Sequence, residues 1–195
     1  MRKTTAVIAV AALVFAAFAM SGCSAWFQSP AKPANDAIAV ANTHLKAAAA
    51  LETEVSAGGS ALQSLPYTPA GATDAVKITG TAMEDLTKER AELLSAKTAM
   101  DGIEKLDVSQ PFKAYAKLES ASIDARVALV DAETRLYDAM DRLYKALADT
   151  STKVDVQEMI TAIQQMQSEV AALSETAGKA SQAASDFFTT NKLGG

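Results

Sequence analysis

The sequence predicts an all-α fold, an elongated up-down-up-down four-helix bundle, on three observations. Alanine, the best helix former, makes up about a fifth of the 195 residues. Proline, which breaks helix interiors, occurs only at Pro30, Pro33, Pro66, Pro69 and Pro111 and leaves long windows free. Apolar residues recur at alternating spacings of three and four, whereas the alternation typical of strands is missing. A three-helix bundle with a loosely packed first helix remains the alternative.

The first helix is expected to begin at Asn35 or Asp36, because both residue types are good N-caps. Gly58 and Gly59 are expected to end or bend it, with a further turn or two up to Leu65. Its apolar face is predicted to consist of Ile38, Ala41, Leu45, Ala48, Leu51 and Val55.

The second helix is expected to follow a connector over residues 65–72 that contains two prolines. It is predicted to begin at Thr73 or Asp74 and to continue to about Lys105. Its apolar set is less regular and comprises Val76, Met83, Leu86, Leu93, Leu94, Met100 and Ile103.

The third helix is expected from Pro111 to about Ala148, since proline is tolerated in a first turn. A strict spacing of three and four predicts one buried row, made of Tyr115, Leu118, Ser122, Ala125, Leu129, Ala132, Leu136, Ala139, Leu143 and Ala146. A second row widens that face and comprises Ile123, Val127, Val130, Tyr137, Met140, Tyr144 and Leu147. Three acid-before-base pairs are interpreted as a solvated outer face, namely Asp131/Arg135, Asp138/Arg142 and Asp141/Lys145.

The fourth helix is expected to start at a capping-box-like pair, Thr152 and Asp155. Its apolar seam has coiled-coil spacing, and the connectors between the four helices are short, which favours antiparallel neighbours in an up-down-up-down rod. The seam comprises Val156, Met159, Ile163, Met166, Val170, Leu173, Ala177, Ala180, Ala184 and Phe187.

The charge pattern argues against a nucleic-acid partner. The chain has 18 basic and 23 acidic side chains with both signs interspersed, so no basic face is available to neutralise phosphates. No glycine-rich phosphate loop or dinucleotide fingerprint occurs. We therefore predict no cofactor and no nucleic acid.

The single histidine, His44, argues against the catalytic and metal sites that are common in helical bundles. No glutamate precedes it by three residues, so the paired Glu-x-x-His set of di-iron bundles is absent. No oxyanion loop or nucleophile elbow accompanies it. We interpret His44 as a histidine at the edge of the core and predict no metal site and no catalytic residues.

The carboxylate groupings are interpreted as ordinary surface charge, because neighbours at i,i+1 or i,i+2 point apart on a helix. They are Glu52/Glu54, Glu84/Asp85 and Glu89/Glu92.

Four residues are candidates for contact with a partner or a ligand. Tyr67 stands between two prolines in a connector, and Tyr137, Met140 and Tyr144 follow one another along the third helix. Tyrosine combines an apolar ring with a polar tip, which suits an interface, although core packing explains the same residues.

The first 23 residues carry a targeting pattern. Arg2 and Lys3 precede an apolar run from Ala6 to Met20, and Ser-Gly-Cys23 follows. The run has 15 residues, whereas about 20 are needed to cross a bilayer, so it predicts a cleaved signal. An ordinary secretory signal is the alternative, but Cys23 is the chain's only cysteine, and a lone thiol in an exported protein needs a reason.

Residues Met20-Ser21-Gly22-Cys23 resemble the lipobox of bacterial lipoproteins, with Met20 where that family usually has Leu. The resemblance implies that Cys23 is acylated and becomes the first residue of the mature chain. It further implies an extracytoplasmic protein, anchored by lipid to the cell membrane or the outer membrane. Ser24 resembles the outer-membrane class of two-membraned bacteria.

The expected organisation is therefore a signal peptide over 1–22, a lipidated cysteine and flexible tether over 23–34, a bundle over 35–190 and a tail over 191–195. The first functional hypothesis is a non-enzymatic interaction or spacer element of the bacterial envelope with a protein or wall partner. The second is a carrier of a small apolar ligand, which an apolar cavity near residues 177–184 would favour. An enzyme is the third and requires buried titratable groups that converge in a cleft. The sequence does not indicate the oligomeric state.

Overall fold

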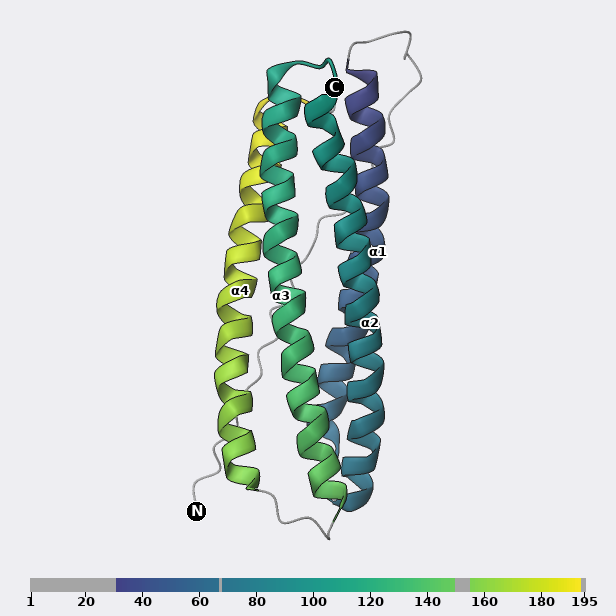
Figure 1. Cartoon of the computed structure of the whole chain (residues 1–195), viewed down its shortest axis with the longest axis vertical. Coiled ribbons are helices and arrows are strands. Elements are labelled where there is room, and N and C mark those ends of the chain that lie inside the picture. The colour runs from purple at the N-terminus through teal and green to yellow at the C-terminus, as the bar shows by residue number, and fades with distance from the viewer. Residues whose placement is uncertain (1–30, 67, 150–154, 194–195) are drawn as a thin grey trace.

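The computed structural model describes residues 31–66, 68–149 and 155–193, and these form four long helices in an up-down-up-down bundle (Figure 1). The predicted fold is confirmed. The helices are α1 (Lys32–Ser64), α2 (Pro69–Gly102), α3 (Gln110–Ala148) and α4 (Val156–Thr190), and a short 3-10 turn, η1 (Ile103–Lys105), follows α2. Four predictions lie outside the described residues: the signal peptide, acylation of Cys23, a contact through Tyr67 and the role of Thr152.

Helix α1 begins earlier than predicted, ends within the predicted turns before Leu65 and has no break at the glycine pair. It starts at Lys32, with a proline in its first turn, and it passes through Gly58 and Gly59 without interruption. Tertiary packing explains this: a Cβ on Gly58 would lie 3.4 Å from Cγ2 of Ile78, and one on Gly59 would lie 3.1 Å from the hydroxyl of Tyr137. Both glycines therefore lie against side chains of neighbouring helices, and at Gly59 a side chain would crowd the Tyr137 hydroxyl.

Helix α2 begins at Pro69, four residues before the predicted start at Thr73. Thr68 is the N-cap, and its side chain accepts a hydrogen bond from the backbone N–H of Gly71 at 3.1 Å. The turn is so tight that a Cβ on Gly71 would lie 2.1 Å from the carbonyl oxygen of Pro66. Capping by threonine and proline in the first turn thus outweighs the later Thr73-Asp74 signal.

Helices α3 and α4 begin close to where the sequence places them. Ser109 is the N-cap of α3. At the start of α4 the side chain of Asp155 accepts hydrogen bonds from the backbone N–H groups of Gln157 and Glu158, at 3.0 and 3.2 Å. The predicted role of Thr152 lies outside the described residues.

Each helix packs on the one before it in the chain, and α1 and α4 do not pack against each other to a comparable extent. The core is built mainly from α1, α2 and α3, and the first helix is not loose. Helix α4 is the peripheral one, with only Ile163, Ala177 and Ala184 buried along its length. The rest of its predicted seam is half-buried, because α4 covers α3 alone.

The C-terminal end of α4 is well anchored. The Phe188 ring packs against Tyr115 of α3 with ring centroids 4.9 Å apart, and Leu193, in the predicted tail, is buried in the core. The start of α1 and the end of α4 lie at the same end of the rod (Figure 1).

Among the described helices, none has the length and hydropathy that crossing a membrane would require.

Candidate functional site

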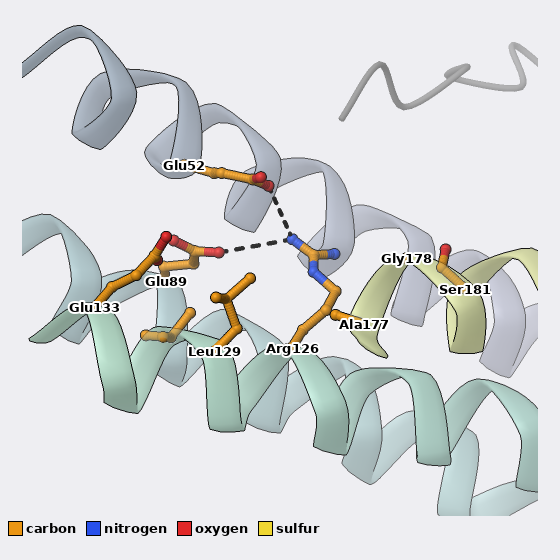
Figure 2. Close-up of a pocket in the computed structure, with 9 residues that line it drawn as sticks. Glu52, Glu89, Arg126, Leu129, Glu133, Ala177, Gly178 and Ser181 are labelled. Atoms are coloured by element: carbon orange, nitrogen blue, oxygen red, sulfur yellow. Dashed lines mark hydrogen bonds and ion pairs between the residues drawn. The ribbon is translucent and has the colours of Figure 1, made fainter. Parts of the chain in front are cut away.

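A buried arginine lies at the centre of the bundle. Arg126 of α3 is only 7% exposed. Its Nη2 atom donates to Oε2 of Glu52 on α1 at 3.4 Å and lies 3.6 Å from Oε1 of Glu89 on α2 (Figure 2). Helices α1 and α2 are thereby tied to α3 by charge. We call Arg126, Glu52, Glu89 and Glu133 the Arg126 cluster.

Glu89 is the most deeply buried acid of this cluster. It is 3% exposed, and its Oε2 atom has no hydrogen-bond partner among the described residues. Burial raises the pKa of Glu89 to about 8; Arg126 opposes this rise, whereas Glu52 and Glu133 add to it. A carboxylate with one free buried oxygen is therefore held near the point of ionisation at neutral pH.

Two further acids of α3 face the same arginine. Burial and, next, the charge of Glu52 raise the pKa of Glu133 to about 7, and Arg126 opposes the rise. Burial also raises the pKa of Glu119, again against the effect of Arg126. One guanidinium thus compensates several carboxylates, so the bundle interior has an excess of acid.

A small cavity opens beside the cluster, between α1 and α4. Its volume is about 20 Å³, enough for one or two water-sized groups. Charged residues form one side, and the α4 side consists of small residues. The lining comprises Glu52, Glu89, Arg126, Leu129, Val130, Glu133, Ala177, Gly178 and Ser181 (Figure 2).

This cavity is not the apolar cavity that would favour a ligand carrier. It does lie beside Ala177, within the predicted stretch, but three glutamates and an arginine line it and an organic ligand would not fit its volume.

The interpretation of Glu52, Glu89 and Asp85 as free surface charge is wrong. Asp85 is 5% exposed and accepts from Lys88 at 2.8 Å. A sequence signal for Glu89 was present: it stands three residues after Leu86 and four before Leu93, within the 3,4 series of α2. The carboxylates were interpreted as neighbouring pairs, without their place in the helical period, and this overlooked that some of them lie on the apolar face.

A heptad signal was also present in α3. Glu119, Arg126 and Glu133 are seven residues apart, and they alternate with Ile123 and Val130 in one 3,4 series. Charges at one seam position of a helix are expected to face its neighbours. The acid-base-acid order at that position predicts an internal ion cluster, which the sequence analysis missed.

Of the three acid-base pairs predicted on α3, Asp138/Arg142 and Asp141/Lys145 form, with 2.6 and 2.7 Å between their charged atoms. Asp131 pairs with Arg90 of α2 at 2.8 Å, and Arg135 pairs with Glu169 of α4 at 2.7 Å. These contacts between helices replace the predicted pair because the neighbouring helices bring opposite charges within reach.

Asp141 is a further correction, since it is buried instead of solvated. It is 5% exposed and accepts a hydrogen bond from the hydroxyl of Thr79 at 3.1 Å, in addition to its ion pair with Lys145 at 2.7 Å.

His44 lies at the edge of the core, as predicted, and is half-buried. Its Nδ1 atom is 2.6 Å from Oε2 of Glu92, which joins α1 to α2. Glu92 is therefore engaged in a contact between helices and is not a free surface acid.

The candidate contact residues on α3 are not brought to the cavity. Tyr137 is buried and donates a hydrogen bond to the carbonyl oxygen of Val55 at 3.1 Å, and burial raises its pKa to about 12. Met140 and Tyr144 are partly buried against the same core. These three residues hold helices together in the described structure.

Within residues 31–66, 68–149 and 155–193, no group of three or more His, Cys, Asp or Glu side chains is arranged to hold a metal ion. Comparison with protein-family models, with curated proteins and with solved structures finds no match to this chain.

Proposed function

We propose that the protein is a non-enzymatic, lipid-anchored helical bundle of the bacterial cell envelope that serves as an interaction or spacer element. The resemblance of Met20-Ser21-Gly22-Cys23 to a lipobox supports the location. The space at the Arg126 cluster argues against catalysis at that site, because the convergent titratable groups surround about 20 Å³, which is too small for an organic substrate.

The half-buried seam of α4 is the observation that carries the interaction role. Its apolar residues repeat at coiled-coil spacing, and Met166, Val170 and Leu173 are only half-buried, because α4 packs extensively on α3 alone. An apolar stripe on a surface helix is typical of a face that receives another helix.

The dimensions of the bundle support a spacer role. Helix α3 has 39 residues, which corresponds to about 58 Å at 1.5 Å per residue. Helix α1 starts at Lys32, a few residues after Cys23, so an anchor at Cys23 would hold that end of the rod close to the bilayer. The connector between α1 and α2 would then project away from it.

Intact-mass analysis of the native protein, extracted from membranes, tests the anchor. We expect a chain that begins at Cys23 and has the added mass of a diacylglyceryl group, and we expect Cys23→Ala to leave the membrane fraction. An unmodified thiol at residue 23, or an uncleaved leader, would contradict the proposal.

Site-specific photo-crosslinking in intact cells tests the interaction. A photoreactive residue at Met166, on the half-buried seam, is expected to capture a protein or wall component. The matched position Ser168 lies exposed on the same helix and is expected to capture little. Equal capture at both positions would contradict a seam-directed interaction.

A further inference from the structure

We infer that the cavity at the Arg126 cluster receives the ammonium group of a lysine side chain, carried by a helix of a partner protein that lies between α1 and α4. The inference rests on the proposed function as an interaction element and adds the chemistry of the partner.

The cluster contains more acidic than basic side chains and leaves one buried acceptor without a donor. Glu52, Glu89 and Glu133 line the cavity, and Arg126 is the only basic residue that does so. Oε2 of Glu89 is buried and has no hydrogen-bond partner among the described residues. An ammonium group supplies N–H donors to such an oxygen and adds one positive charge to the site.

The volume of the cavity selects the kind of cation. A space of about 20 Å³ holds a group the size of one or two water molecules. An ammonium is a compact point charge at the end of a flexible stem, whereas a guanidinium is a planar fork of three nitrogens. Lysine therefore fits this site better than arginine.

The position of the cavity makes it reachable from outside. It lies beside α1 and α4, which do not pack extensively on each other, and its α4 side consists of Ala177, Gly178 and Ser181. Small residues allow the backbone of an incoming helix to come close, as they do in tightly packed helix pairs. Leu173 lies one turn before Ala177 on α4 and is partly exposed, so apolar contact continues beyond the charged site.

Charge also favours a different protein over a second copy of this chain. The formal net charge of the chain is −5, so two copies repel each other, whereas a helix with a basic residue is attracted to this acidic site.

The first test measures whether the site accepts an ammonium group. The full-length protein, labelled with ¹³C at its glutamate carboxyls, is titrated with n-butylammonium and followed by NMR. Two control compounds are n-butanol, which lacks the charge, and tetramethylammonium, which has the charge but is larger and has no N–H. We expect a saturable shift of the Glu89 signal with n-butylammonium alone.

Matched variants place the response at the site. We expect Glu89→Gln and Glu133→Gln each to raise the half-saturating concentration at least tenfold. Glu175→Gln, an exposed change on α4, is expected to leave it unchanged. Circular dichroism establishes that each variant keeps its helicity. A response that is absent, that is equal for the three compounds or that persists in both site variants would overturn the inference.

The second test identifies the source of the ammonium in intact cells. A photoreactive residue at Ser181, beside the cavity, is compared with one at Gln182, which is exposed. We expect capture at Ser181 of a helical segment of another protein that contains lysine, reduced at least fivefold by Glu89→Gln. Capture of a second copy, of a segment without lysine, or of nothing beyond the Gln182 control would overturn it.

The two proposals fail in different ways. Loss of acylation at Cys23 would contradict the anchor and leave the amine titration unchanged, whereas a failed titration would leave the anchor and the seam of α4 intact.

Discussion

The hydroxyl of Tyr137 on α3 donates a hydrogen bond to the backbone carbonyl of Val55 on α1, over 3.1 Å and within the buried core. The contact joins two helices that are separated in the chain by all of α2. It lies next to Gly59, where a Cβ would be 3.1 Å from the same hydroxyl. A tyrosine of α3 and a glycine of α1 thus make this contact together.

Removal of the hydroxyl in Tyr137→Phe is expected to lower the free energy of unfolding by about 1 kcal/mol, the usual net contribution of one hydrogen bond. Urea unfolding followed by circular dichroism measures the change. The ring remains in place, so the dependence of the unfolding free energy on urea concentration, the m-value, should not change. A stability equal to that of the parent would show that the bond contributes nothing.

Alanine substitutions at two helical glycines are expected to differ. Gly80→Ala has open space around the new Cβ, so the gain in helix propensity should stabilise the protein by about 0.5 to 1 kcal/mol. Gly59→Ala should gain less or lose stability, because its Cβ crowds the Tyr137 hydroxyl. The melting temperatures of Gly80→Ala, Gly59→Ala and the parent protein, measured in parallel, test this difference.

A double-mutant cycle tests the cause of that difference. In the Tyr137→Phe background the oxygen is gone, so Gly59→Ala should approach the gain seen at Gly80. If Gly59→Ala costs the same in both backgrounds, the crowding explanation is wrong.

Stability should fall as the pH rises from about 5 to about 8, through the ionisation of Glu89. The pKa of Glu89 is about 8 in the folded protein, above its ordinary value, so the folded state binds the proton more tightly than the unfolded state. The contribution is fully present below the unfolded pKa and is lost as the pH passes the folded pKa. Burial of Glu133, with a pKa of about 7, adds to the same trend.

Unfolding of the parent and of Glu89→Gln across this pH range isolates the effect. Since glutamine does not ionise, the difference in unfolding free energy between the two proteins should shift by a few kcal/mol between pH 5 and pH 8, at about 1.4 kcal/mol per unit of pKa difference. A constant difference would show that Glu89 ionises with an ordinary pKa.

Replacement of Arg126 should be among the most damaging single changes. Arg126→Leu leaves Glu89 and Glu52 without their guanidinium, and breaking a buried ion pair on one side typically costs about 3 to 5 kcal/mol. The loss should be smaller at pH 5, where Glu89 is protonated. Thermal unfolding of the parent and of Arg126→Leu at pH 5 and at pH 8 measures the loss of stability at each pH.

Removing both charges provides the control for that prediction. The pair Arg126→Leu with Glu89→Leu is expected to be less destabilised than Arg126→Leu alone, because no uncompensated carboxylate remains at position 89. If the double variant loses as much unfolding free energy as the two single variants together, the loss arises from packing and not from charge.

Local signals account for the parts of the fold that were predicted correctly. The third helix starts and ends where its proline and its period of three and four place it. The fourth begins at the predicted Thr152-Asp155 signal, although Asp155 itself is the N-cap and not the third residue of a capping box. Helix propensity, capping and periodicity act over one or two turns, so the sequence carries them directly. The error at Gly58 and Gly59 occurs where neighbouring helices decide the outcome, whereas the error at Pro69 arises between two local signals, of which the Thr68 cap prevails.

The sequence by itself determined that the chain forms four long helices and which face of each is apolar, since these properties follow from local periodicity. Only the tertiary structure decided that α4 covers α3 alone, and that Glu52, Glu89 and Glu133 gather around Arg126. Periodicity places Glu89 on the inner face of α2, but it does not tell which side chains of other helices lie opposite. The physical reason is that burial and pKa depend on neighbours brought together from four helices, and those distances exist only once the helices pack.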